Sequence, residues 1–477
     1  MPEPTAERPL AAYSRAIAEA DLQSHRGRVT NLIGLVIEAT GLRAEVGELV
    51  TIAGGRNRAA VPAEVVGFRN GRALLMPLGD MRGIAPGTVV APTGGPFRVP
   101  VGDALLGRVL DGLGRPIDGG AEITGCRPRV VAGSPPSPMD RPRISERLDL
   151  GVRALDALVP CGRGQRLGIF AGSGVGKSTL LGSIARATTA SVNVICLVGE
   201  RGRELLEFIE RDLGDALARS VVIVATSDQP ALVRIKAALV ATTIAEHFRD
   251  SGADVLLMMD SVTRLAIAQR EVGLAIGEPP ATRGYTPSVF AMLPQLLERA
   301  GTSGRGSITG LYTVLVEGDD MNEPVADAVR SILDGHCVLT RSLAHKSHYP
   351  AVDILQSVSR LADEITSPAV RSAAAALRET LAAYRAKEDL ITIGAYSPGA
   401  DASVDYAIAK VPEIDAFLRQ PADEAADATE TDLRLMELMA DRDSGAQAVQ
   451  NIEPANAGTT FATPAVDYLD ANRLLEA

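Results

Sequence analysis

The sequence predicts an α/β protein built around a mostly parallel sheet, and three observations carry this prediction. Between Gly151 and roughly Leu361, apolar strand patterns alternate with helical ones, the arrangement that covers both faces of a parallel sheet with helices. A glycine-rich turn follows the first of these strands. A valine-rich, turn-rich region precedes this part and an alanine-rich helical region follows it. The 477 residues are enough for two or three separate cores.

The glycine-rich turn is the most specific signal in the chain. Residues 167–181 read L-G-I-F-A-G-S-G-V-G-K-S-T-L-L, an apolar strand, then glycines, then the start of a helix. Backbone N–H groups in such a loop, and the positive end of the helix, can surround a polyphosphate. Lys177 is expected to bridge the β- and γ-phosphates and the Ser178 hydroxyl to bind Mg²⁺. The predicted nucleotide-binding residues of the loop are Gly172, Ser173, Gly174, Val175, Gly176, Lys177, Ser178 and Thr179.

One position departs from the strict phosphate-loop pattern. Ala171 stands where that pattern has glycine, which is tolerable if the residue ends a strand with negative φ. Glycines alone would also suit an ordinary strand-to-helix turn. The Lys-Ser pair at the right offset, between a strand and a helix, favours phosphate binding.

Composition limits the compartment and the partners. No apolar run approaches the ~18 residues of a spanning helix, and the first residues lack a secretory signal pattern. Four scattered cysteines predict a reduced, cytoplasmic protein. Of the net charge of −11, the segment from Pro421 onward carries −9, from twelve acidic and three basic residues. The remainder is nearly neutral, so no basic face predicts a nucleic-acid partner.

Changes in pattern along the chain predict its domains. The pattern of the first residues predicts an amphipathic helix that packs on its own domain or docks to a partner. Valine-rich segments between G-G, N-G and P-G turns predict a small closed β-barrel. The acidic end predicts a flexible tail with local binding helices. The expected boundaries are residues 1–24 for the helix, 25–97 for the barrel, 98–150 for a connecting segment, 151–365 for the nucleotide-binding core, 366–420 for a helical domain and 421–477 for the tail.

Functional groups in such a core belong at the carboxyl ends of its strands. Glu200 follows one strand in G-E-R-G-R-E and can orient the water that attacks the γ-phosphate; its alternative role is to stabilise a helix N-terminus. Asp260 ends D-V-L-L-M-M-D and can hold Mg²⁺ or cap a helix. The expected strands are Gln165–Phe170, Val192–Val198, Val221–Ala225, Asp254–Met259, Ile308–Leu315 and Cys337–Leu339.

Two later stretches leave alternatives open. The run from Gly273 to Pro287 is too rich in glycine and proline for a helix, and suits a subunit contact, a pore lining or a plain surface connection. Tyr349, before a proline, can stack on an adenine ring or be an ordinary buried loop residue.

Taken together, the motifs resemble the flagellar protein-export ATPases of the type III secretion ATPase family, relatives of the rotary ATP synthase α and β subunits. The resemblance covers about residues 25–420 and rests on A-G-S-G-V-G-K-S, G-E-R-G-R-E, A-T-S-D-Q-P, D-V-L-L-M-M-D-S-V-T-R, L-A-I-G-E-P-P-A-T-R-G-Y-T-P-S-V-F and H-Y-P-A-V-D-I-L-Q-S-V-S-R. It implies a RecA-like P-loop core with an N-terminal β-barrel and a C-terminal helical domain. It also implies ATP and Mg²⁺ as substrate and cofactor.

The resemblance assigns roles to individual residues. Glu200 falls on the family's catalytic glutamate, with Arg201 and Glu204 on neighbouring phosphate and Mg²⁺-water positions. Tyr349 falls on the adenine-stacking aromatic. Arg360 falls on the arginine that reaches a neighbouring subunit's γ-phosphate. The expected catalytic residues are therefore Glu200, Lys177, Arg201 and Arg360, and the expected metal-binding residues are Ser178, Glu204 and Asp260.

The resemblance further implies an assembly and its partners. It predicts a homohexamer whose Gly277–Arg283 loop faces a coiled-coil stalk protein in the pore. It also favours partner docking for the helix around Leu10–Ala20, through a dimeric regulator. Export-gate membrane proteins and chaperone–substrate complexes complete the expected partners, with a cytoplasmic location at the inner-membrane export apparatus. The acidic tail is longer than the family pattern.

Three rival functions follow from the same residues. The virulence injectisome ATPase shares the chemistry, although L-A-I-G-E-P-P-A-T and A-I-A-K-V-P-E-I-D-A-F-L-R-Q favour the flagellar branch. A hexameric RNA-translocating helicase needs an RNA-stacking domain and basic character, which the sequence lacks. A nucleotide-binding subunit without turnover is disfavoured by Glu200.

Overall fold

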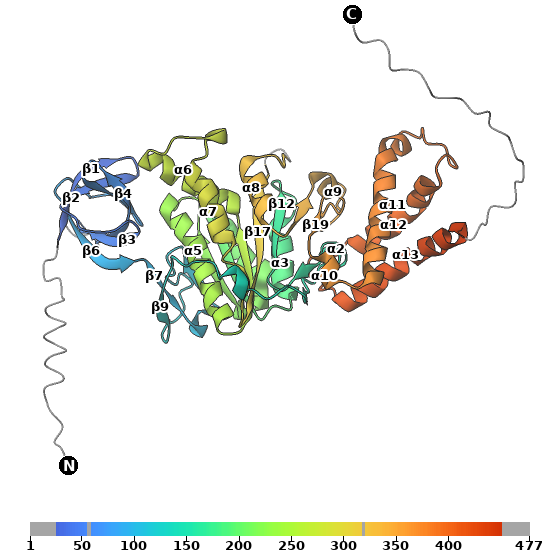
Figure 1. Cartoon of the computed structure of the whole chain (residues 1–477), viewed down its shortest axis with the longest axis horizontal. Coiled ribbons are helices and arrows are strands. Elements are labelled where there is room, and N and C mark those ends of the chain that lie inside the picture. The colour runs from blue at the N-terminus through green and yellow to red at the C-terminus, as the bar shows by residue number, and fades with distance from the viewer. Residues whose placement is uncertain (1–24, 55–58, 317–319, 451–477) are drawn as a thin grey trace, which may run out of the picture.

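The computed structural model describes residues 25–54, 59–316 and 320–450. The predicted helix within residues 1–24 lies outside this part. The described chain has an N-terminal barrel, a central sheet flanked by helices, and a C-terminal group of helices, arranged from left to right in Figure 1. No helix in these ranges is long and apolar enough to cross a membrane.

The first domain is the predicted closed antiparallel barrel, with strand order β1-β2-β5-β4-β3-β6. Its interior is filled by small branched side chains, including Val50, Ile52 and Leu75, none of which reaches solvent. Alternation of buried and exposed residues along each strand produces this interior. The strands are β1 (Gly27–Ile33), β2 (Val36–Thr40), β3 (Glu48–Ile52), β4 (Val61–Arg69), β5 (Arg72–Pro77) and β6 (Val89–Pro96).

The central sheet has nine strands and forms the middle layer of the nucleotide-binding domain. Its main strands pair in parallel, and all six predicted core strands are present. The main order is β19 (Val358–Ser359), β18 (Gly335–Leu339), β12 (Arg166–Ala171), β17 (Ser307–Leu315), β15 (Asp254–Asp260), β13 (Val192–Val198), β14 (Ser220–Ala225) and β8 (Val109–Asp111), with β16 (Gly301–Thr302) paired to β17.

Both faces of this sheet are buried, as its continuous apolar strands predict. Along β13, Val194 and Cys196 belong to one hydrophobic cluster while Ile195 and Leu197 belong to the other. The first cluster includes residues of α5 (Ala231–Asp250), α6 (Val262–Ile276), α7 (Pro287–Leu297) and α8 (Pro324–Ile332). The second includes residues of α2 (Arg153–Leu158), α3 (Lys177–Ala187), α11 (Pro368–Thr392), α12 (Ala402–Leu418) and α13 (Ala428–Gln450).

Shorter elements connect these layers. The segment predicted as a connection contributes β8 to the edge of the central sheet. It also contributes β7 and β9, which pair as a separate two-stranded antiparallel sheet. The remaining elements are β7 (Arg98–Val101), η1 (Asp103–Leu105), β9 (Arg127–Val130), η2 (Pro138–Asp140), β10 (Arg147–Leu148), β11 (Cys161–Gly162), α4 (Gly202–Glu207), the π-helix η3 (Phe208–Leu213), η4 (Gly214–Arg219), η5 (Thr282–Gly284), α9 (Arg341–His345) and α10 (Ala362–Ile365).

The chain beyond Gln420 differs from the predicted flexible tail over its first part. Helix α13 packs against α11 and α2, and its Leu435 and Met439 are buried. An ion pair of 2.9 Å joins Asp432 to Arg147. Apolar residues at i and i+4 on this helix face the rest of the domain, which is why the segment is ordered. The described tail is therefore part of the core.

Candidate nucleotide-binding site

The phosphate loop lies between the carboxyl end of β12 and the first turn of α3. Ala171 is the last residue of β12 and is buried, so its methyl group is accommodated in the strand as predicted. Gly174 and Gly176 have φ of 79° and 85°, a left-handed conformation that favours glycine. Helix α3 then begins at Lys177, which directs its N-terminal end at the loop.

Lys177 is held at the centre of the site by two carboxylates. Its ammonium forms a close ion pair with Asp260 and lies 3.6 Å from an oxygen of Glu200. Thr313, on the neighbouring strand β17, donates a 2.7 Å hydrogen bond to the Asp260 carboxylate. Four parallel strands, β12, β13, β15 and β17, thus bring these groups together at one edge of the sheet. The structure therefore places Lys177, predicted to bind phosphates, next to Asp260, predicted to bind Mg²⁺.

Glu200 lies just beyond the carboxyl end of β13. Burial raises the pKa of its carboxyl group, while the nearby Lys177 ammonium opposes that rise. About a quarter of the side chain remains exposed, at 26%. A carboxylate with a raised pKa, beside the phosphate loop and open to solvent, is suited to orienting water or accepting a proton.

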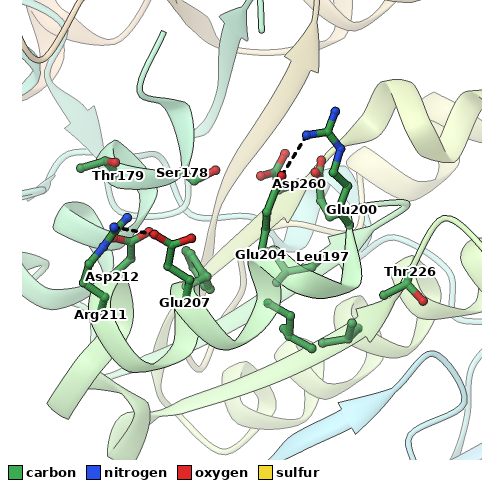
Figure 2. Close-up of a pocket in the computed structure, with 14 residues that line it drawn as sticks. Ser178, Thr179, Leu197, Glu200, Glu204, Glu207, Arg211, Asp212, Thr226 and Asp260 are labelled. Atoms are coloured by element: carbon green, nitrogen blue, oxygen red, sulfur yellow. Dashed lines mark hydrogen bonds and ion pairs between the residues drawn. The ribbon is translucent and has the colours of Figure 1, made fainter. Parts of the chain in front are cut away.

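Arg201 and Glu204 lie at the start of α4, toward solvent. An ion pair of 3.0 Å joins them, and the Arg201 side chain is 70% exposed. Figure 2 shows Ser178 and Thr179 on one side of the pocket, with Glu200, Glu204 and Asp260 on the other. These residues line a cavity of about 180 Å³ between α3 and the α4–η3 wall. Arg201 and Glu204 therefore border the predicted site from its outer side.

A second cavity, of about 480 Å³, lies on the other side of the phosphate-loop helix. Tyr349 lines it, and its ring lies 3.5 Å from the position that a Cβ atom would take at Gly176. The Tyr349 ring is 46% exposed, so it is not the buried loop residue of the alternative interpretation. The cavity lining is Val152, Gly174, Gly176, Thr179, Leu180, Ser183, Tyr349, Pro350, Gln420, Pro421 and Ala422.

Arg360 lies at the opposite end of the sheet. It follows β19, whose Ser359 pairs with Gly335 at the start of β18. The phosphate loop follows Ala171, which is level with Leu339 at the end of β18. Four strand residues separate these levels, or about 13 Å along the sheet. The structure does not bring exposed Arg360 to this chain's own phosphate loop.

Comparison with known proteins gives the same division of the chain. Three family descriptions match in order: the beta-barrel domain of the ATP synthase alpha/beta family over residues 29–94, its nucleotide-binding domain over 151–359, and the T3SS EscN ATPase C-terminal domain over 366–437. The Flagellum-specific ATP synthase of Bacillus subtilis (strain 168) is 55% identical over 412 residues, covering 86% of this chain and 94% of the relative.

The chain belongs to the flagellar and type III secretion ATPase family. A second relative, the Type 3 secretion system ATPase of Xanthomonas euvesicatoria, is 49% identical over 440 residues, covering 91% and 99% of the two chains. The structure of assembled EscN from enteropathogenic E. coli matches with a TM-score of 0.82 at 45% identity, covering 87% and 100%. EscN in complex with its central stalk EscO matches with a TM-score of 0.80 at 44% identity, over the same shares.

The ATPase is thus a P-loop enzyme that hydrolyses ATP, with the predicted RecA-like core, barrel and helical domain. Sequence reasoning missed several residues of its site. Thr313 donates a hydrogen bond to Asp260. Arg264 packs against Gly199 and, like Lys177, opposes the burial that raises the pKa of Glu200. Ala422, from the predicted tail, lines the second cavity. The motif D-S-V-T-R could have indicated Arg264. Thr313 and Ala422 lie in segments that carry no recognisable sequence motif.

Proposed function

We propose that this ATPase hydrolyses Mg²⁺-ATP at sites shared between subunits of a homohexamer, and that hydrolysis energises flagellar type III protein export. The position of Arg360 carries the shared-site part of the proposal. Its own phosphate loop is at the other end of the sheet, so a neighbouring subunit must supply the arginine that completes a site. Arginine fingers of this kind contribute about 10³–10⁵ in rate to phosphoryl transfer.

The residues at the carboxyl edge suit Mg²⁺-ATP. Ser178, Asp260 and Glu204 offer the hydroxyl and carboxylate oxygens that Mg²⁺ prefers. Within the described part of the chain, no group of three or more His, Cys, Asp or Glu residues could hold a metal unaided. Mg²⁺ sites in such enzymes share their ligands with phosphates and water, so this donor set fits. The ion would offset charge on the β- and γ-phosphates.

Each protein group then has one task. Glu200 orients the attacking water and accepts its proton, as its raised pKa allows. Lys177 and Arg201 offset the negative charge that develops on the transferred phosphoryl group. Tyr349 stacks on the adenine ring in the second cavity, which opens beside the phosphate loop.

The biological role is supported by the named relatives. The 55% identity to a flagellum-specific enzyme favours flagellar export, through chaperone release and delivery of substrates to the export gate. The EscN–EscO complex supports a coiled-coil stalk in the hexamer pore, facing the Gly277–Arg283 loop. An injectisome ATPase is the second candidate, because relatives of that class are 49% identical over nearly their whole length. The family assignment gives no support to the alternative function of an RNA-translocating helicase.

The remaining partners are proposed with the assembly. A dimeric regulator would bind the helix predicted within residues 1–24, which lie outside the described part. Export-gate proteins and chaperone–substrate complexes would meet the hexamer in the cytoplasm, at the periphery of the inner membrane.

Two experiments test the proposal. Specific ATPase activity should rise steeply with protein concentration as sedimentation detects hexamers; activity that stays flat while hexamers form contradicts shared sites. Expression in two bacterial strains, one lacking its flagellar export ATPase and one lacking its injectisome ATPase, should restore secretion of flagellar proteins only. Restoration of injectisome secretion alone would instead support the second candidate.

A further inference from the structure

Helix α3 separates the two cavities and contributes to both. Thr179 lines the smaller, catalytic cavity and also the larger, base-side cavity. The catalytic cavity is closed by the wall formed by α4 and η3, residues 202–213. The base-side cavity is closed by residues 420–422 of the strap, which we define as residues 420–424. The spacing between wall and strap, measured across α3, therefore sets the shape of the whole nucleotide site.

Arg186, in the last turn of α3, makes hydrogen bonds to both structures. One terminal nitrogen donates a close hydrogen bond to the backbone carbonyl of Asp212, in the wall. The other donates to the carbonyl of Ala422, in the strap, at 2.6 Å. Asp212 lines the catalytic cavity and Ala422 lines the base-side cavity. One guanidinium thus joins the outer boundaries of the two cavities.

Each connection is reinforced by close packing on α3. The wall approaches so closely that a Cβ atom at Gly182 would lie 2.6 Å from the Asp212 carbonyl oxygen. The hydroxyl of Ser183 donates a second hydrogen bond to the Ala422 carbonyl, at 2.7 Å. Residues 182, 183 and 186 lie on neighbouring turns of one helix, so they contact the wall and the strap together.

The strap is in turn connected to the adenine-stacking residue. The backbone N–H of Gln420 donates to the Tyr349 carbonyl at 2.9 Å. The Gln420 side-chain amide bonds the carbonyls of Gly151 and Glu424. A shift of the strap would therefore move the base-side cavity and Tyr349 with it. On the other side of α3, the π-helical part of the wall, which includes Asp212, continues directly from α4, which carries Glu204.

We propose that Arg186 is a positioning residue. It holds the catalytic wall and the base-side strap at one spacing, so that a nucleotide bound by its base also has its phosphates correctly placed for hydrolysis. This inference rests on the proposed ATPase function of the same site. Arginine suits the task because its planar fork can donate to two carbonyls at once, whereas a lysine ammonium is a single point charge. Its position in the last turn of α3 is also favourable for a cation.

A matched arginine on the same helix end provides a control. Arg219 donates to the carbonyls of Ala185, Arg186, Thr188 and Ala190, and so caps the C-terminal end of α3. It lines neither cavity. Loss of its hydrogen bonds should lower the melting temperature without changing catalysis by the folded enzyme.

The test uses the full-length protein and compares kcat for ATP, the Kd for ADP from calorimetry, and Tm. Arg186→Gln should weaken ADP binding and lower kcat, each by about tenfold, because both carbonyls lose a charged donor. Arg186→Lys should partly restore either kcat or the Kd, but not both, because one ammonium cannot reach both carbonyls. Ser183→Ala removes a donor to the strap alone, so it should raise the Kd by a larger factor than it lowers kcat.

Arg219→Gln should change Tm alone. If Arg186→Gln changes only Tm, or alters only one of kcat and Kd, Arg186 does not join the two sides and the inference is overturned. A wild-type protein that binds ADP but does not hydrolyse ATP would instead contradict the ATPase function itself, so the two failures are distinguishable.

Discussion

The two ends of the central sheet contribute very differently to the site. At the carboxyl end, the Lys177 ammonium lies within ion-pair distance of both Glu200 and Asp260, which come from two other segments. At the amino end, the backbone N–H of Arg360 donates a 3.0 Å hydrogen bond to the carbonyl of Asp334. The carboxyl end forms a site within one chain, because parallel strands end together there. Under the proposed function, the amino end serves catalysis at a neighbouring subunit.

Removing the amino-end arginine should have the largest effect. Arg360→Ala should lower kcat by about a thousandfold, because the transition-state charge loses its finger. ADP binding to a single subunit should persist, since Arg360 lies outside both cavities. Steady-state kinetics and calorimetry on assembled protein measure the two effects. A variant that retains wild-type kcat would show that one chain holds a complete site.

The carboxyl end is tested by Glu200→Gln, which should lower kcat about a hundredfold by removing the base. Burial raises the pKa of this carboxyl, so the active carboxylate is lost on acidification at a higher pH than for a free glutamate. Wild-type kcat should therefore fall as pH drops through that raised pKa. The profile of the variant should lack this acidic limb, and an unchanged limb would assign it to another group.

A third substitution tests how the amino end is held. Arg378 of α11 donates to the carbonyls of Ile354, Ser357 and Leu158, and so fixes the segment that leads to Arg360. Arg378→Gln should lower kcat about tenfold by displacing the finger, with little change in the Kd for ADP. Lys387, which is exposed on the same helix, is the control, and Lys387→Gln should leave kcat unchanged. Equal effects of both substitutions would argue for general destabilisation.

The smallest expected effect concerns base stacking. Tyr349→Ala should weaken ADP binding by about tenfold, and Tyr349→Phe should retain wild-type affinity because the ring is kept. Calorimetric titration with ADP distinguishes the variants. Equal affinity of the alanine variant and the wild type would show that the second cavity does not bind the base.

Local pattern predicted the carboxyl end well and the longer-range features poorly. The phosphate loop and the strand ends at Glu200 and Asp260 are encoded in short contiguous motifs, and the structure brings them together. Strand β8 has only three residues and is held by its pairing with β14, so no period could identify it. Arg186 donates to carbonyls 26 and 236 residues away. Because every residue has a backbone carbonyl, these contacts cannot be recognised from residue types.

The tail shows the same limitation. The acidic end predicts local binding helices, but the helix that forms there, α13, packs against the chain's own α2 and α11. Burial of Leu435 and the ion pair of Asp432 with Arg147 both depend on residues far away in the sequence. Hydrophobic periodicity identifies an apolar face without identifying what covers it.

Mixing two inactive variants tests the shared site most directly. Lys177→Ala subunits lack the phosphate-binding lysine and Arg360→Ala subunits lack the finger, so each supplies what the other has lost. In randomly mixed hexamers about a quarter of the interfaces would combine an intact Lys177 with an intact Arg360. ATPase activity should therefore reappear on mixing, well above either variant alone. No recovery, in mixtures whose hybrid hexamers are verified by differently tagged subunits, would contradict action of Arg360 at a neighbouring site.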